Sequence, residues 1–141
     1  MAHIWVGAIN GNVPAGAVPA GTDDDGSPLW VARGPYEGGI RIGKVRPAFG
    51  SANIPYGGSE VKIYQYEVLL NPDFWVPASD GNVPPGAIAW GQESDGTGLF
   101  VARAAYGPGL HIGEVRAAFG AANIPYGGDE LRVNPYEVLV G

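Results

Sequence analysis

The seven residues ANIPYGG occupy positions 52–58 and return unchanged at positions 122–128, an offset of 70 residues. Proline restricts φ and the paired glycines supply positive φ, so each copy predicts an extended segment that ends in a tight turn. The same offset relates YEVL at 66–69 to YEVL at 136–139, with no gap between the two alignments. A fixed period along the whole chain indicates that one structural unit occurs twice.

The two units follow one another without a linker. The first repeat spans residues 1–72, and the second spans residues 73–141. A unit of about 70 residues buries too little apolar surface to be very stable alone. We therefore expect both repeats to form one domain with pseudo-two-fold symmetry. The first strand of each repeat also carries a tryptophan, Trp5 or Trp75, that needs a packing surface, so we expect strands to be exchanged between the repeats.

Short strands and turns account for each repeat. The stretches PLWVAR (28–33) and GLFVAR (98–103) are rich in apolar, β-branched and aromatic residues, which favour strands. In GGIRIGKV (38–45) the alternation of apolar and polar residues stops at Gly43, which indicates a bulge or a close approach of backbone. Proline or glycine interrupts every helical periodicity. The predicted fold class is all-β, built from short antiparallel strands.

Composition excludes several classes of partner. The chain has 141 residues, 45% of them hydrophobic, with a net charge of −6 and only 8 lysines and arginines. Without a basic stripe that could neutralise phosphates, nucleic acid is not expected as a partner, nor is an anionic membrane surface. The absence of cysteine excludes disulfides and zinc sites built on thiolates.

The sequence shows no targeting segment. No apolar run approaches the ~20 residues of a membrane span, so membrane insertion is not expected. The N-terminal stretch MAHIWVGAINGNVP lacks the basic start, apolar core and cleavage site of a secretory signal. We expect a cytoplasmic protein, and non-classical release to the extracellular space stays open.

Enzymatic motifs are absent from the sequence. The two histidines are His3 and His111, and His111 aligns with Arg41 of the other repeat. No nucleophile elbow, phosphate-binding glycine loop or His-x-x-x-His zinc spacing occurs. DDDG (23–26) resembles part of a calcium loop but lacks the remaining ligands, so it predicts a turn with solvated carboxylates. We expect no enzyme activity, no cofactor and no metal.

Differences between the repeats carry more information than their identities. RIGKV (41–45) aligns with HIGEV (111–115), so Lys44 becomes Glu114, while Asp23 becomes Glu93. One repeat therefore offers a charged acceptor and a charged donor, and the other offers two acids. A weak surface salt bridge followed by sequence drift explains the same pattern. Trp90 replaces Ala20 and is a further candidate for an interface or a site.

Both repeats carry the ordered motifs GNVP, DG, VAR, IG, FG, NIPYGG and YEVL. This frame, over residues 4–140, resembles the DM-nine repeat family, also described as natterin-like, and within it the tandem-repeat mannose-binding lectins of molluscs. The resemblance implies a compact all-β fold and a calcium-independent lectin for mannose and high-mannose glycans. It also implies a homodimer and a role in the innate recognition of microbes.

The resemblance also implies which residues hold the sugar. The acidic residue of the turn and the lysine after Ile-Gly correspond to Asp23 and Lys44. A carboxylate accepts hydrogen bonds from vicinal hydroxyls, an ammonium donates to them, and opposite charges hold each other in place in the empty site. In the second repeat, Glu93 keeps the acid but Glu114 replaces the lysine. We expect a second, weaker site there, because two carboxylates repel each other.

Two other functions stay open. The first is a non-catalytic protein-interaction module without sugar binding, since the frame by itself does not require a sugar. The second is a carbohydrate-active enzyme that uses paired carboxylates. Competition by mannose separates the first from a lectin, and turnover of mannan separates the second.

Overall fold

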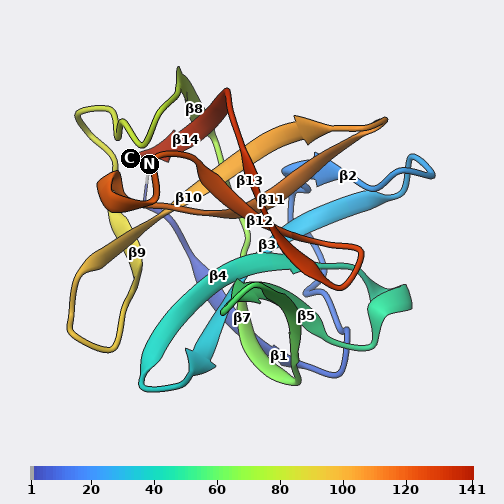
Figure 1. The fold of residues 1–141 in the computed structure, drawn as a ribbon. Coiled ribbons are helices and arrows are strands. Elements are labelled where there is room, and N and C mark those ends of the chain that lie inside the picture. The colour runs from blue at the N-terminus through green and yellow to red at the C-terminus, as the bar shows by residue number, and fades with distance from the viewer. Residues whose placement is uncertain (1) are drawn as a thin grey trace.

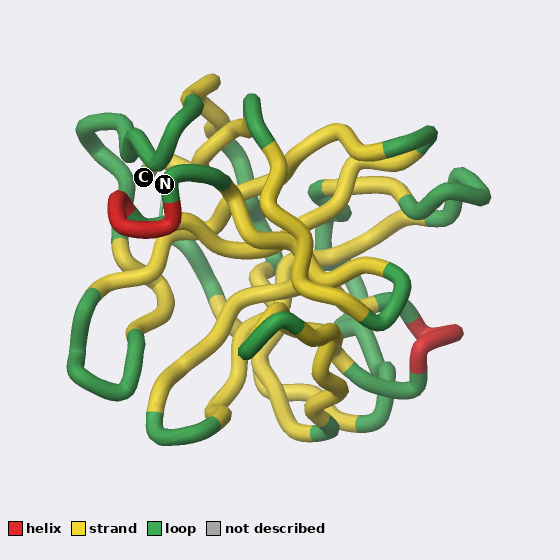
Figure 2. Tube along the Cα trace, in the orientation of Figure 1, coloured by secondary structure: helices red, strands yellow, loops and turns green. Residues whose placement is uncertain are grey.

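The computed structural model describes residues 2–141 as an all-β domain, which confirms the predicted fold class (Figures 1 and 2). Repeat one contains β1 (Trp5–Ile9), β2 (Gly21–Thr22), β3 (Pro28–Tyr36), β4 (Gly39–Val45), the 3-10 turn η1 (Pro47–Phe49), β5 (Ala52–Tyr56), β6 (Ser59–Ile63) and β7 (Gln65–Leu69). Repeat two contains β8 (Phe74–Ala78), β9 (Ala89–Gln92), β10 (Gly98–Tyr106), β11 (Gly109–Val115), the 3-10 turn η2 (Ala117–Phe119), β12 (Ala122–Tyr126), β13 (Asp129–Val133) and β14 (Tyr136–Val140). No helix among residues 2–141 has the length and apolar character needed to cross a membrane.

The repeated motif ANIPYGG forms the hairpin that the sequence predicts. It supplies β5 and the turn to β6 in repeat one, and β12 and the turn to β13 in repeat two. In the first turn Gly57 and Gly58 have φ of 60° and 88°, a left-handed region that favours glycine. The local sequence therefore determines both strand ends and the turn between them.

The repeats exchange strands, but not the first strands, β1 and β8, which contain Trp5 and Trp75. The first strands, β1 and β8, pair with β7 and β14 of their own repeats. The exchange is made by β2, which pairs with β11 through Thr22 and Leu110, and by β9, which pairs with β4 through Gln92 and Ile40. Trp5 finds the packing surface that it needs in a side chain of the other repeat, because the ring centroids of Trp5 and Trp90 lie 5.9 Å apart.

The exchange closes a ring of eight strands in the order β3, β2, β11, β12, β13, β6, β5 and β4. In Figure 1, β2 lies beside β11. Each exchanged strand carries the acidic turn that follows it into the neighbouring repeat. The pairing thus decides which side chains of the other repeat the acids of each turn meet.

Two hairpin turns meet where the repeats are related by the pseudo-two-fold axis. The amide of Gly58 donates to Glu130 Oε1 at 3.0 Å, and the amide of Gly128 donates to Glu60 Oε1 at 2.9 Å. The backbone adds two reciprocal bonds, from the Glu60 amide to the Gly128 carbonyl and from the Glu130 amide to the Gly58 carbonyl. The four bonds repeat the same interaction with the repeats interchanged, as two-fold symmetry requires.

One hydrophobic cluster contains residues of both repeats. Leu29, Val31 and Ile42 are fully buried in it, together with their counterparts, which are Leu99, Val101 and Ile112. A further cluster lies within each repeat. Neither repeat contains the shared cluster alone, so separating the repeats would expose these side chains to water.

Gly43 marks a close backbone approach and not a bulge. The β3–β4 register runs through it without a shift, and Ala32 pairs with Gly43. A Cβ at Gly43 would overlap the carbonyl oxygen of Asn53 in β5, and Gly113 has the same relation to Asn123. The glycine therefore brings β5 close to β4 beside Lys44, which is only 2% exposed.

Candidate functional site

The Lys44 ammonium lies between the two repeats. Lys44 belongs to β4, and its Nζ is 3.0 Å from Nδ1 of His111, which belongs to β11 of the other repeat. The ring of Tyr126 lies beside the same ammonium, with 5.5 Å between Nζ and the ring centroid. Two residues of repeat two therefore confine the lysine that the sequence singled out in repeat one.

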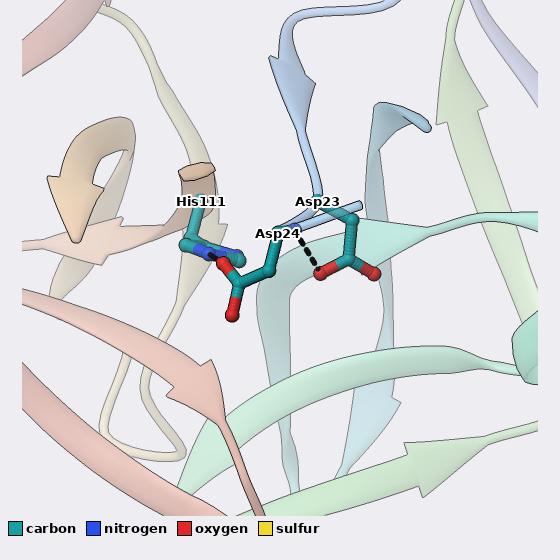
Figure 3. A group of neighbouring side chains, drawn as sticks. All are labelled: Asp23, Asp24 and His111. Carbon is teal, nitrogen blue, oxygen red and sulfur yellow. Dashed lines mark hydrogen bonds and ion pairs between the residues drawn. The ribbon is translucent and has the colours of Figure 1, made fainter. Parts of the chain in front are cut away.

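A chain of hydrogen bonds runs from Lys44 to the protein surface. An ammonium only donates, so Nδ1 of His111 accepts from Lys44 and the ring proton lies on Nε2. This Nε2–H donates to Asp24 Oδ1 at 3.0 Å, as Figure 3 shows. The hydroxyl of Tyr126 donates to the other oxygen of Asp24. The chain crosses the repeat boundary at each step, because Lys44 and Asp24 belong to repeat one while His111 and Tyr126 belong to repeat two.

The electrostatics of the chain favour a neutral imidazole. Burial lowers the pKa of His111, the charge of Lys44 lowers it further, and Asp24 acts in the opposite direction. Burial also lowers the pKa of Lys44, while the carboxylates of Glu60, Asp23 and Asp24 favour its charged form. The hydrogen bond from Tyr126 lowers the pKa of Asp24. The site thus contains an ammonium, a neutral imidazole and ionised carboxylates.

Asp23 lies in the same site, but it is not paired with Lys44. Its Oδ2 accepts from Arg46 Nη1 at 2.9 Å, and its Oδ1 accepts from the amide of Asp24 at 2.9 Å. No ion pair within 4.0 Å joins Asp23 to Lys44 among the described residues. The two charges therefore form no direct ion pair, and Asp23 acts on Lys44 only by favouring its charged form. Arg46 orients Asp23, and His111 orients Lys44.

The Lys44 ammonium has donors to spare. It carries three N–H groups, and the bond to His111 is its only hydrogen bond within residues 2–141. Buried polar groups are normally satisfied, since an unmet donor costs about 1–3 kcal/mol. Two free donors on a buried ammonium, close to the carboxylates of Asp23 and Asp24, form a site that can hold a ligand with neighbouring hydroxyl groups.

The symmetry-related cluster is closed by its own ion pairs. Glu114 takes the position of Lys44, and Arg41 takes that of His111. Oε1 of Glu114 accepts from the amide of Ile42 at 2.9 Å, and Oε2 accepts from Arg41 Nη2 at 2.6 Å. Nη1 of the same guanidinium donates to Glu93. The two acids do repel each other, since the charge of Glu93 raises the pKa of Glu114, but Arg41 of the other repeat lies between them and donates to both.

Burial dominates the ionisation of this second cluster. Glu114 is fully buried, which raises its pKa to about 8, and Arg41 acts against the increase. Arg116 Nε adds an ion pair to Glu93 Oε2 at 2.9 Å. Both oxygens of Glu114 and both terminal nitrogens of Arg41 are therefore engaged within the protein. The Nε of Arg41 is nevertheless buried without a hydrogen-bond partner, so the contrast with the Lys44 cluster is that both acids here are already bound by the cation between them.

Three side chains of the Lys44 cluster have the chemistry of metal ligands. Donor atoms of Asp23, Asp24 and His111 lie within 4.8 Å of one another (Figure 3). However, the Lys44 ammonium occupies Nδ1, so the proton on Nε2 leaves no lone pair to face a cation. The positive charge of Lys44 also opposes a second cation. The arrangement suits hydroxyl groups better than a metal ion.

The DM9 repeat model matches the chain at residues 1–63 and 50–133, which together cover most of the chain. The chain belongs to the DM9 repeat family. No curated protein matches the chain significantly. The first DM9 match contains Asp23, Asp24 and Lys44, and the second contains His111 and Tyr126. Both DM9 repeats are therefore needed to complete one cluster.

Sequence reasoning missed three of the residues in this DM9 cluster. Asp24, His111 and Tyr126 were not predicted, because each of their contacts joins residues more than 60 positions apart. One signal was present: Arg41 changes to His111 at the same three-residue spacing at which Lys44 changes to Glu114. The paired change reflects a direct contact between these positions across the repeats.

Trp90, the remaining candidate, takes part in packing elsewhere. Its ring contacts the rings of Trp5 and His3, and its carbonyl accepts from Arg33 Nη1 at 2.9 Å. It also packs against the hydrophobic cluster shared by the DM9 repeats. These contacts account for the packing of the ring, while the indole Nε1 is buried without a hydrogen-bond partner among the described residues.

Proposed function

We propose that this DM9 protein is a non-enzymatic lectin that binds mannose without a metal, through Lys44 and Asp23. The observation that supports the proposal is the buried Lys44 ammonium with two unused donors beside acidic groups. An ammonium can donate to two vicinal hydroxyl oxygens of a pyranose, and a carboxylate can accept from the same hydroxyls. Charge-assisted hydrogen bonds of this kind contribute about 1.5–3 kcal/mol each.

The DM9 repeat architecture is consistent with a lectin-like carbohydrate-binding module. Mannose and high-mannose glycans are the proposed ligands because the sequence resembles mannose-binding members of the family. One site of this size would bind a monosaccharide with a dissociation constant of about 10 µM to 1 mM. Branched microbial glycans would then be held by avidity across a homodimer, which is the assembly we propose.

We propose that the Glu93/Glu114 cluster contributes little to sugar binding. The carboxyl groups of Glu93 and Glu114 already accept hydrogen bonds within the protein, because Arg41 donates to both. A sugar that took the place of either acid at Arg41 would have to break a buried, charge-assisted hydrogen bond, which costs more than breaking an exposed one. The expected stoichiometry is one mannose per chain.

Calorimetric titration with methyl α-mannoside, in the presence and absence of EDTA, tests this function. Lys44→Met and Asp23→Asn should each weaken binding by at least about tenfold, in keeping with the loss of one charge-assisted bond. Lys62→Met is the matched control, because Lys62 is the only other lysine and is exposed. Undiminished binding by both site variants would refute the assignment, and loss of binding in EDTA would refute the metal-free mechanism.

The same purified protein can be used to test the two alternatives, a protein-interaction module and a carbohydrate-active enzyme. Capture of a protein from lysate that free mannose fails to compete would favour an interaction module over a lectin. Release of reducing ends from mannan would favour an enzyme. The proposal predicts mannose-sensitive capture and no increase in reducing ends.

A further inference from the structure

His111 contacts the lysine of the proposed sugar site, although His111 belongs to the repeat that is expected to bind sugar weakly. Its Nδ1 is the only hydrogen-bonding partner of Lys44 Nζ among residues 2–141. Its side chain is fully buried, and its ring packs edge-on against Tyr126 with 4.9 Å between centroids. The imidazole is therefore held between Tyr126 of its own repeat and two residues of repeat one, Lys44 and Asp24.

We propose that His111 is a positioning residue for the sugar site, and that its protonation displaces the Lys44 ammonium and weakens sugar binding at mildly acidic pH. The proposal rests on the proposed function, since it deals with the regulation of the same site. Under this proposal the second repeat contributes to sugar binding without binding a sugar molecule itself. Repeat two supplies the acceptor that places the lysine of repeat one.

The tautomer explains why the contact is sensitive to pH. A neutral imidazole has one lone pair, and at Nδ1 this lone pair accepts from Lys44. A second proton can enter only at Nδ1, where it would point at an ammonium 3.0 Å away. Two buried cations with opposed N–H groups repel one another, so Lys44 must leave the position from which its free donors reach a ligand.

The groups facing His111 decide at which pH this happens. Lys44 faces Nδ1, and Asp24 faces Nε2, while Tyr126 covers the ring. Asp23 lies close enough to favour the protonated form, as Asp24 also does, but burial and Lys44 outweigh them and lower the pKa of His111. The ordinary pKa of histidine is about 6.5, so the change is expected below that pH.

Two isosteric variants separate the two nitrogens of the ring. The side-chain oxygen of asparagine can take the place of Nδ1, so His111→Asn keeps an acceptor for Lys44 and cannot titrate. The terminal amide of glutamine takes the place of Nε2, so His111→Gln keeps a donor for Asp24 but removes the acceptor for Lys44. His3→Asn is the control for the only other histidine.

The experiment measures the dissociation constant of methyl α-mannoside from pH 7.5 to pH 5.0 for the protein and the three variants. The affinity of the protein and of His3→Asn should fall once the pH drops below the pKa of His111, by up to about tenfold for each further pH unit. His111→Asn should retain measurable binding at pH 7.5 and lose less than about twofold of it down to pH 5.0, whereas His111→Gln should bind more weakly than His111→Asn at every pH. Parallel pH profiles for the protein and His111→Asn would overturn the proposal, since the carboxylates remain in both.

A measurement without sugar distinguishes failure of this proposal from failure of the proposed function. ¹⁵N NMR of the imidazole and lysine groups reports the protonation of His111 and the environment of Lys44 Nζ. The Lys44 signal should shift with the same midpoint as the His111 signal in the protein, and should stay constant in His111→Asn. A Lys44 signal that ignores the titration of His111 would refute the coupling even if mannose binds. A coupled shift without any mannose binding would refute the lectin instead.

Discussion

Arg41 Nη2 donates a hydrogen bond to Glu114 Oε2 at 2.6 Å, across the boundary between the repeats. The equivalent contact in the other cluster joins Lys44 and His111 at 3.0 Å. The charge reversal from Lys44 to Glu114 is thus accompanied by a second change, from Arg41 to His111. The two changed positions are in contact, since Lys44 contacts His111 and Glu114 contacts Arg41. One cluster contains a spare cation, and the other is closed by its own ion pair.

This matching predicts strong coupling between the two positions of the closed cluster. Glu114→Lys alone would bury an ammonium against Arg41, which is 4% exposed, and should destabilise the protein by about 3–5 kcal/mol. Arg41→His with Glu114→Lys recreates the Lys–His contact, so the double variant should be more stable than the sum of the single effects by at least about 1 kcal/mol. Urea unfolding of the protein and the three variants measures this coupling, and additive effects would contradict it.

Adding Ser94→Asp to that double variant should create a second sugar site. Ser94 aligns with Asp24, so the triple variant regains the acid that accepts from the imidazole in the Lys44 cluster. Under the proposed function, calorimetric titration with mannose should change from one to two sites per chain. A stoichiometry that stays at one in a folded triple variant would show that the Lys–His–Asp chain is not sufficient for binding.

Glu114 should make the protein less stable as the pH rises through neutrality. Its pKa is about 8 in the folded protein and about 4.5 in the unfolded chain. Between these values the folded state binds more protons, so the free energy of unfolding falls with pH by up to about 1.4 kcal/mol per unit. Urea unfolding from pH 5 to pH 8.5 should show this slope, and Glu114→Gln should flatten it. Equal slopes for the two proteins would exclude Glu114 as the group responsible.

A serine that occurs in only one repeat should also stabilise the other repeat when it is introduced at the equivalent position. Ser51 donates to Asn53 Oδ1 at 2.8 Å, whereas Ala121 takes its place in repeat two and leaves the buried Oδ1 of Asn123 without a partner. Ala121→Ser should therefore raise the free energy of unfolding by about 0.5–1.5 kcal/mol, and Ser51→Ala should lower it by about 1–3 kcal/mol. Thermal or urea unfolding tests both, and a stabilising Ser51→Ala would contradict the assignment.

The close approach at Gly113 should tolerate no side chain. A Cβ there would overlap the carbonyl oxygen of Asn123, a backbone atom that cannot rotate away. Gly113→Ala is expected to cost more than about 3 kcal/mol, or to prevent folding. Gly7→Ala is the control, because a Cβ at Gly7 in β1 meets no atom within 4 Å. Circular dichroism and urea unfolding should show a native-like control and a disrupted Gly113 variant.

The repeat and its local elements could be predicted because their causes lie within a few residues. The alternation of apolar residues, the proline and the paired glycines of ANIPYGG are each sufficient to indicate a strand or a turn. Asp23 and Lys44 could be singled out as positions where the repeats differ within a constant frame. Their assignment to a sugar came from the family frame, whose DM9 membership is confirmed.

The partners of these residues could not be predicted in the same way. Thr22 pairs with Leu110, and Ile40 pairs with Gln92, over separations that leave no periodic trace in the sequence. With two near-identical repeats, the acidic turn of repeat one fits β4 or β11 equally well on local grounds. Only the folded chain shows that Asp24 meets His111, and that Arg41 meets Glu93 and Glu114.

The sequence by itself determined an all-β chain of two repeats, the hairpin turns, and the inversion of charge at positions 44 and 114. The tertiary structure alone decided that each cluster draws its residues from both repeats, so that Lys44 faces His111 while Glu114 faces Arg41. The physical reason is range: turns and strands follow from interactions between neighbours in sequence, whereas the ionisation and free donors of a buried charge depend on whichever distant groups the fold places beside it.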